Sequence, residues 1–107
     1  MIKVGHFKLS KSQEAVVAFK QAIRIAPSNA NTFLLLGMTY SQLERWQEAI
    51  QAFKQAIRLK PNSADAHYFL GHAYLDVGDD DGALGQYKIL KRLDPEKAEE
   101  LFNAIYK

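Results

Sequence analysis

The sequence predicts an all-α fold of repeated antiparallel helix pairs, because similar residues recur at a fixed spacing. The three prolines of the chain, Pro27, Pro61 and Pro95, follow one another at 34-residue steps. The same step relates further sets of similar residues: Ala15, Ala49 and Ala83; Phe19, Phe53 and Tyr87; Lys20, Lys54 and Lys88; Arg24, Arg58 and Arg92. A period of this length is typical of arrays in which each unit is one helix–turn–helix.

Length and composition are those of one globular domain. The chain has 107 residues, of which 48% are apolar, and this is enough for a hydrophobic core. The formal charge of +2 does not indicate a nucleic acid or an anionic membrane as partner. The chain has no cysteine, which excludes disulfides, thiolate metal sites and a thiol nucleophile.

Targeting signals are not evident in the sequence. No apolar run approaches the roughly 18 residues that span a bilayer, and residues 1–10 lack the features of a signal peptide. We therefore expect the cytoplasm as the default location and no membrane partner, while a signal or anchor outside this sequence stays open.

Residues 1–9 are predicted to be the last part of a first helix. In register with the later repeats, Lys3 falls where they have Gly37 and Gly71, and His6 falls at a tyrosine position. This degenerate unit is either an end repeat, since terminal repeats are atypical, or the remainder of a longer array.

Residues 12–25 are predicted to be a helix, with either Ser12 or Ser10 capping its first N–H groups. Its apolar residues recur at the 3–4 spacing of an amphipathic face: Ala15, Val16, Phe19, Ala22 and Ile23. Pro27 ends this helix because proline disfavours helical backbone in the residue before it.

Residues 30–63 make one complete unit, with a helix over 30–43 and a second from Arg45 or Trp46 to Leu59. Gly37 costs the first helix about 1 kcal/mol relative to alanine, so we expect it to permit close approach of a neighbouring helix. About three residues separate the helices, and so short a link requires an antiparallel pair.

The next unit repeats this pattern. Asn62 or Ser63 caps a helix over 64–77, Gly78 ends it, and the run Asp79–Asp81 opens a helix that extends to about residue 93. Gly82 and Gly85 weaken that last helix.

A final helix is predicted over 98–106. Asp94 is a cap, and Pro95 follows at the first helical position.

These residues resemble the tetratricopeptide repeat (TPR) family. The matches are Phe33-x-x-Leu36-Gly37-x-x-Tyr40 with Ala49, Phe53, Ala56 and Pro61; His67-x-x-Leu70-Gly71-x-x-Tyr74 with Ala83, Tyr87, Leu90 and Pro95; and Ala15, Phe19, Ala22 and Pro27. Residues 13–31 and 47–65 are identical at 12 of 19 positions. Leu90 departs from the pattern by standing at an alanine position, so the last helix is expected to pack differently.

The resemblance implies an α-α superhelix, or solenoid, with the first helix of each pair lining a concave groove and the second helices forming a convex back. Its units are a truncated repeat 1 over 1–29, repeat 2 over 30–63, repeat 3 over 64–97, and a capping helix or start of a fourth repeat over 98–107. Such repeats are scaffolds that bind peptide segments or helices of other proteins. They perform no chemistry, so the resemblance implies a non-enzyme without cofactors.

Carried onto this sequence, the groove positions of the family define a candidate partner-binding site. Its residues are Asn31, Leu34, Met38, Ser41, Gln42, Asp65, Tyr68, His72 and Asp76, with Val4, Phe7 and Leu75 at related positions. An apolar centre with polar edges is typical of a partner site. Leu34 and Met38 stand where a TPR subclass grips a peptide carboxylate with lysine and asparagine. We therefore expect an amphipathic helix or an extended apolar segment instead.

Other sites are less well supported. The Lys/Arg ladder on the second helices is interpreted as a solvated convex face, since no stacking aromatic residues interleave it. His67 and His72 are five residues apart, on different helix faces, so a metal site is not predicted. The segment Asp79–Gly82 lacks the spacing of a calcium loop.

Two hypotheses for function follow. The leading one is a protein-interaction scaffold that docks a partner segment in the groove. The alternative is a self-associating structural module that oligomerises through incomplete end repeats, since solenoids need capped ends to stay soluble and an uncapped end can stack on another copy.

Overall fold

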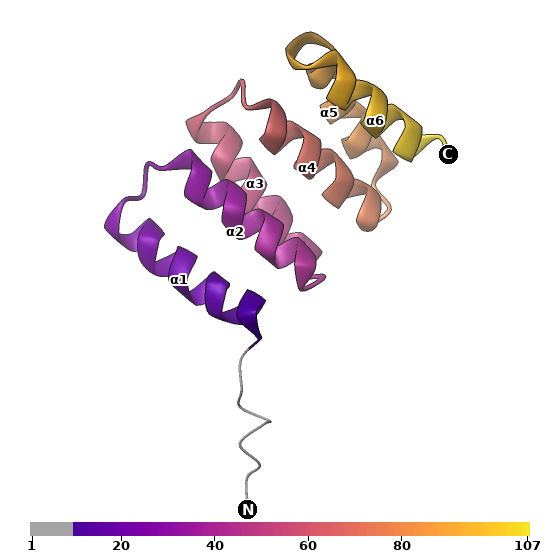
Figure 1. Ribbon diagram of the computed structural model, residues 1–107. Coiled ribbons are helices and arrows are strands. Elements are labelled where there is room, and N and C mark those ends of the chain that lie inside the picture. The colour runs from indigo at the N-terminus through magenta and orange to yellow at the C-terminus, as the bar shows by residue number, and fades with distance from the viewer. Residues whose placement is uncertain (1–9) are drawn as a thin grey trace, which may run out of the picture.

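The computed structural model describes residues 10–107, and these form six α-helices and no strand (Figure 1). The helices are α1 Lys11–Ile25, α2 Ala30–Gln42, α3 Trp46–Leu59, α4 Ala64–Asp76, α5 Asp80–Leu93 and α6 Pro95–Ile105. Each packs against the next, so α2–α3 and α4–α5 are antiparallel pairs stacked side by side. The predicted all-α solenoid is confirmed. None of these six helices combines the length and apolar character needed to cross a bilayer.

The first helices α2, α4 and α6 form one layer, and α3 and α5 lie behind them (Figure 1). Five of the helices begin and end within one residue of the predicted bounds. The exception is α6, which begins at Pro95 and not at residue 98, so Asp94 is the cap and Pro95 the first helical residue, as predicted. The predicted helix end in residues 1–9, with Val4 and Phe7, lies outside the described residues.

The helix starts are stabilised by side chains from the positions just before them. Ser10, not Ser12, caps α1: Gln13 N–H donates to Ser10 Oγ at 3.0 Å, and Ser10 N–H donates back to Gln13 Oε1 at 2.9 Å. Ser63, not Asn62, caps α4. Asp79 accepts from the N–H of Gly82 at 2.8 Å, so the aspartate run is a helix cap.

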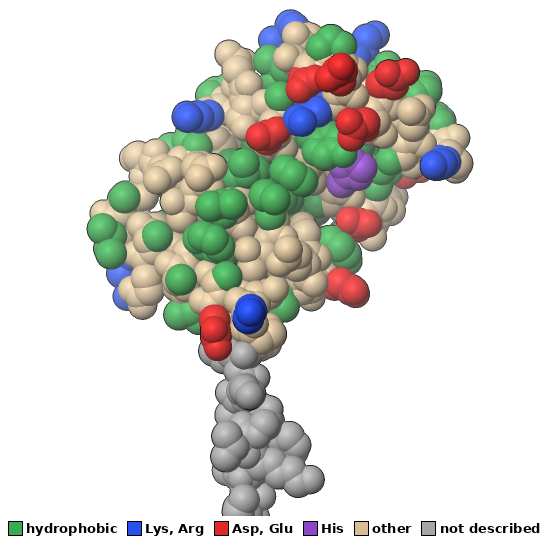
Figure 2. Space-filling model, viewed as in Figure 1, with side chains coloured by type: hydrophobic (Ala, Val, Ile, Leu, Met, Phe, Trp, Pro, Cys, Tyr) green, Lys and Arg blue, Asp and Glu red, His purple; other side chains and the backbone are tan. Residues whose placement is uncertain are grey.

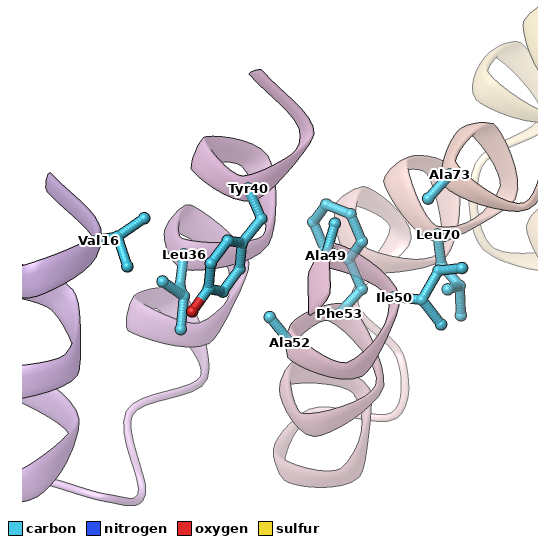
Figure 3. Packing of buried hydrophobic residues seen from close by; sticks show 9 residues of the cluster. All are labelled: Val16, Leu36, Tyr40, Ala49, Ile50, Ala52, Phe53, Leu70 and Ala73. Atoms are coloured by element: carbon cyan, nitrogen blue, oxygen red, sulfur yellow. The ribbon is translucent and has the colours of Figure 1, made fainter. Parts of the chain in front are cut away.

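The main core is built from residues of α1, α2, α3 and α4, and Figure 3 shows its buried side chains. Phe53 is only 1% exposed and lies against the backbone of α2 at Gly37, where a Cβ would come within 2.5 Å of its ring. The predicted reason for Gly37 is therefore confirmed: the glycine admits an aromatic ring of the partner helix.

A second buried cluster joins α5 and α6 through Leu90, Ala98 and Leu101. A Cβ at Gly71 would come within 2.5 Å of the Leu101 side chain. These contacts hold α6 against α4 and α5, and buried Leu90 is part of them.

Candidate functional site

All nine predicted groove residues lie on α2 and α4 with partly or fully exposed side chains. Figure 2 views this surface, which we call the first-helix face, and apolar side chains gather in its middle over α2 and α4. Asn31, Gln42, Asp65 and Asp76 are exposed, and the other five are half-buried. An apolar centre with polar margins is thus present on this face.

The apolar centre is larger than the sequence predicted. Leu34 and Met38 are half-buried against the main core, and Leu35 beside them is 37% exposed. Phe69 on α4 is half-buried, stacks on Phe53 at 6.0 Å and meets the ring of Tyr68 edge-on at 5.4 Å. Leu35 stands three residues before Met38 on the same helix. This spacing puts the two side chains on one side of the helix, so Leu35 could have been assigned to the site from the sequence.

A hollow of about 200 Å³ lies at the seam between α2 and α4. Three predicted site residues, Asn31, Leu34 and Asp65, line it with Ala30, Ala56, Lys60 and Ser63. The stacking of the repeats therefore brings Asn31 and Leu34 of α2 to the same surface depression as Asp65 of α4. Asn31 and Asp65 are 34 residues apart, so they stand at equivalent positions of the two repeats.

Helix α6 contributes polar groups that sequence reasoning missed. The hydroxyl of Tyr68 donates to Glu100 Oε1 at 2.8 Å, and Lys97 Nζ lies 3.6 Å from Asp65 Oδ1 and 5.4 Å from the centre of the Tyr68 ring. Burial and the Glu100 hydrogen bond raise the pKa of Tyr68 above its usual value of 10.0. One edge of the first-helix face is therefore made by α6.

His72 is the titratable group at the centre of this edge. Its ring meets Tyr68 edge-on with 4.6 Å between centroids, and its buried Nε2 has no hydrogen-bond partner. Burial lowers the pKa of His72 from 6.5, while the charges of Asp76 and Glu100 act in the opposite direction. His72 is thus predominantly neutral at pH 7, with two carboxylates nearby.

His67 has a structural position on the inward face of α4. Its Nδ1 lies 2.6 Å from Gln86 Oε1 on α5, and its Nε2 lies 2.8 Å from the carbonyl oxygen of Pro61. The ring is buried and ties α4 to its neighbours, so it does not join His72 on the first-helix face.

The basic ladder lies on the second helices, where all six side chains are exposed: Lys20, Arg24, Lys54, Arg58, Lys88 and Arg92. None of these six is half-buried or part of either apolar cluster. This arrangement agrees with the predicted solvated face.

Stacked antiparallel helix pairs define the class of a helical-repeat protein. Four family models match the chain: tetratricopeptide repeat models over residues 6–29, 18–51 and 66–100, and a TPR repeat model over 37–78. Together they extend from residue 6 to residue 100. The chain belongs to the tetratricopeptide repeat family, whose repeats serve as protein-interaction scaffolds.

Solved structures give the same fold. The Arabidopsis OM64 TPR domain matches with a TM-score of 0.84 at 18% identity, over 90% of this chain and 81% of that one. The first TPR of Spaghetti (RPAP3), bound to the HSP90 peptide SRMEEVD, matches with a TM-score of 0.85 at 20% identity, over 95% and 82%.

MamA AMB-1 matches with a TM-score of 0.75 at 32% identity. The match includes 78% of this chain but only 49% of the MamA chain, so it spans about half of that protein. A sequence search of curated proteins found no match.

Proposed function

We propose that this chain binds a segment of a partner protein across the first-helix face. The observation that carries the proposal is the apolar centre formed by Leu34, Leu35 and Met38, which is partly exposed between polar margins. Exposed apolar surface with a polar rim is typical of protein-binding sites, and methionine adapts to irregular partner surfaces.

A structural neighbour supports this use of the fold, since the first TPR of Spaghetti (RPAP3) was solved with a bound peptide. The chemistry of the bound segment is proposed to differ here. Leu34 and Met38 are aliphatic where a carboxylate-gripping groove needs lysine and asparagine, so this face favours an amphipathic helix or an extended apolar segment.

A pull-down with the purified chain as bait tests the proposal. The double variant Met38→Glu plus Tyr68→Ala introduces a charge and removes an aromatic surface on the first-helix face. We expect it to lose partner proteins that the unsubstituted chain retains, because burying an unpaired carboxylate is costly.

The matched control is Gln51→Glu plus Val17→Ala, which changes one charge and one exposed apolar residue on α3 and α1. Thermal unfolding of both variants checks that each remains folded. Equal capture by the two double variants would contradict binding at the first-helix face.

Self-association is a second candidate, and the outer surface of α6 favours it. Phe102 and Tyr106 are 40% and 60% exposed, their rings are 4.7 Å apart, and Tyr87 extends the group at 5.3 Å from Phe102. If a second copy covers these rings, light scattering will show a dimer that Phe102→Ser plus Tyr106→Ser converts to monomer. A monomer at all concentrations would remove this candidate.

A further inference from the structure

Charge is separated between the first and the second helices of the repeats. The first helices α2, α4 and α6 carry five carboxylates and one lysine, a formal net charge of −4. The second helices α1, α3 and α5 carry eight basic and four acidic residues, a net charge of +4. The chain is weakly basic as a whole, with a formal net charge of +2. The acidic charge of the first helices is therefore not evident from the total charge.

The ends of the helices strengthen this separation. Each second helix has at least one basic residue in its last turn, where it offsets the partial negative charge of the helix C-terminus. None of the three first helices does. The last residue of α4 is itself an acid, Asp76, so the negative potential at this end is increased.

The acidic groups do not surround the whole apolar centre. Helix α2 has no charged residue, and Asp65 on α4 has Lys97 as its ion-pair partner. Of the other four carboxylates, Glu96 and Glu99 lie on α6, while the charges of Asp76 and Glu100 act on His72. Glu100 is anchored there by Tyr68, whose ring also contacts His72. The face therefore has an apolar half on α2 and an acidic edge around His72.

We propose that the segment bound here is an amphipathic helix with a basic side, and this inference rests on the proposed function. Its apolar side packs on Leu34, Leu35 and Met38. A lysine or arginine of the segment lies over His72 between Asp76 and Glu100, where an acidic segment would be repelled. The aliphatic stem of such a side chain can pack on the aromatic rings while its charge meets the carboxylates.

Selection from a random library of 16-residue peptides displayed on phage, with the immobilised chain as target, tests this inference. We expect the enriched peptides to combine leucine-like residues at helical spacing with lysine or arginine, and to have a positive net charge. Synthetic copies of the enriched peptides are then measured by fluorescence anisotropy at low and high salt.

Three variants separate the contributions to affinity. Asp76→Asn plus Glu100→Gln keeps hydrogen-bonding amides in place and removes both charges, and we expect about 5- to 20-fold weaker binding with a smaller salt dependence. Asp80→Asn plus Asp81→Asn changes the net charge equally on α5 and is expected to leave affinity unchanged. Met38→Gln removes apolar contact without adding charge and is expected to weaken binding.

The outcomes distinguish the inference from the function on which it rests. Enriched peptides that are neutral or acidic, or that bind the Asp76→Asn plus Glu100→Gln variant as well as the unsubstituted chain, overturn the basic partner. The groove function survives in those cases if Met38→Gln still weakens binding. Absence of enrichment, or peptides insensitive to Met38→Gln, overturns both.

Discussion

Gly37 and Gly71 occupy the same position in successive repeats, yet different side chains fill the space beside them. At Gly37 the neighbour is Phe53, from the second helix of the same repeat. At Gly71 the nearest neighbour is Leu101 from α6, although the 34-residue register would place Tyr87 there. Tyr87 instead lies half-buried against Phe102. Both repeats thus require a small residue at this position, but different side chains occupy the space beside it.

The difference follows from the links between helices. Four residues, 60–63, join α3 to α4, and Pro61 lies within this link. Only Asp94 joins α5 to α6, because Pro95 has become the first residue of α6. Asp94 ends α5 and also caps α6, accepting from the N–H of Lys97 at 3.2 Å. Because the link is shorter, α6 begins three residues earlier than the 34-residue register predicts from the start of α4. In this arrangement Leu101 lies beside Gly71.

The largest predicted effect contrasts Phe53 with its register equivalent Tyr87. Phe53→Ala should lower the free energy of unfolding by about 3–5 kcal/mol, because it leaves a cavity in the main core. Tyr87→Ala should cost about 1–2 kcal/mol, since its half-buried ring removes less apolar surface. Urea unfolding measures both. Equal losses would mean that the two aromatic residues support their repeats in the same way.

The glycines themselves give the next largest effect. Gly37→Ala should destabilise by about 1–2 kcal/mol, because the new methyl meets the ring of buried Phe53 and overpacking outweighs the gain in helix propensity. Gly71→Ala should cost less than about 1 kcal/mol, since it meets the flexible end of Leu101 on the terminal α6. Urea unfolding measures both losses of stability. An equal loss for Gly71→Ala would mean that α6 is held as rigidly as α3.

A second pair of equivalent positions, Glu44 and Gly78, should respond in opposite directions. Both have positive φ, 58° and 81°, a conformation that glycine adopts without steric cost. Glu44→Gly should raise the free energy of unfolding by roughly 0.5–1 kcal/mol, and Gly78→Ala should lower it by about 1 kcal/mol. Thermal unfolding measures both changes, and destabilisation by Glu44→Gly would contradict the assigned backbone strain.

The smallest effect concerns pH and the equivalent pair Met38 and His72. Because burial lowers the pKa of His72 in the folded chain, the unfolded chain binds its proton first as the pH falls below 6.5. His72 therefore stabilises the fold fully above that pH and loses this contribution as the pH falls towards its folded pKa. The variant His72→Met should show a shallower loss of stability between pH 7 and pH 5. Parallel curves for the two proteins would contradict the lowered pKa.

The candidate site was predictable in part for the same reason that the helices were. A helix places residues three and four positions apart on one side, so the register alone brought Leu34, Met38, Tyr68 and His72 to one face. Leu35 was missed because it stands at the border between the buried and exposed sides. Lys97 and Glu100 were missed because their approach to Asp65 and Tyr68 depends on where α6 begins.

The sequence by itself determined the helix pairs, their order and the positions that must stay small, because periodicity, caps and prolines act over a few residues and recur every 34. Only the tertiary structure decided which side chain fills the space at Gly71 and which charges surround His72. Those contacts depend on the angle and register of α6 against α4. The one-residue link and the packing of Leu90, Ala98 and Leu101 determine this angle and register. Neither can be predicted from a local sequence pattern.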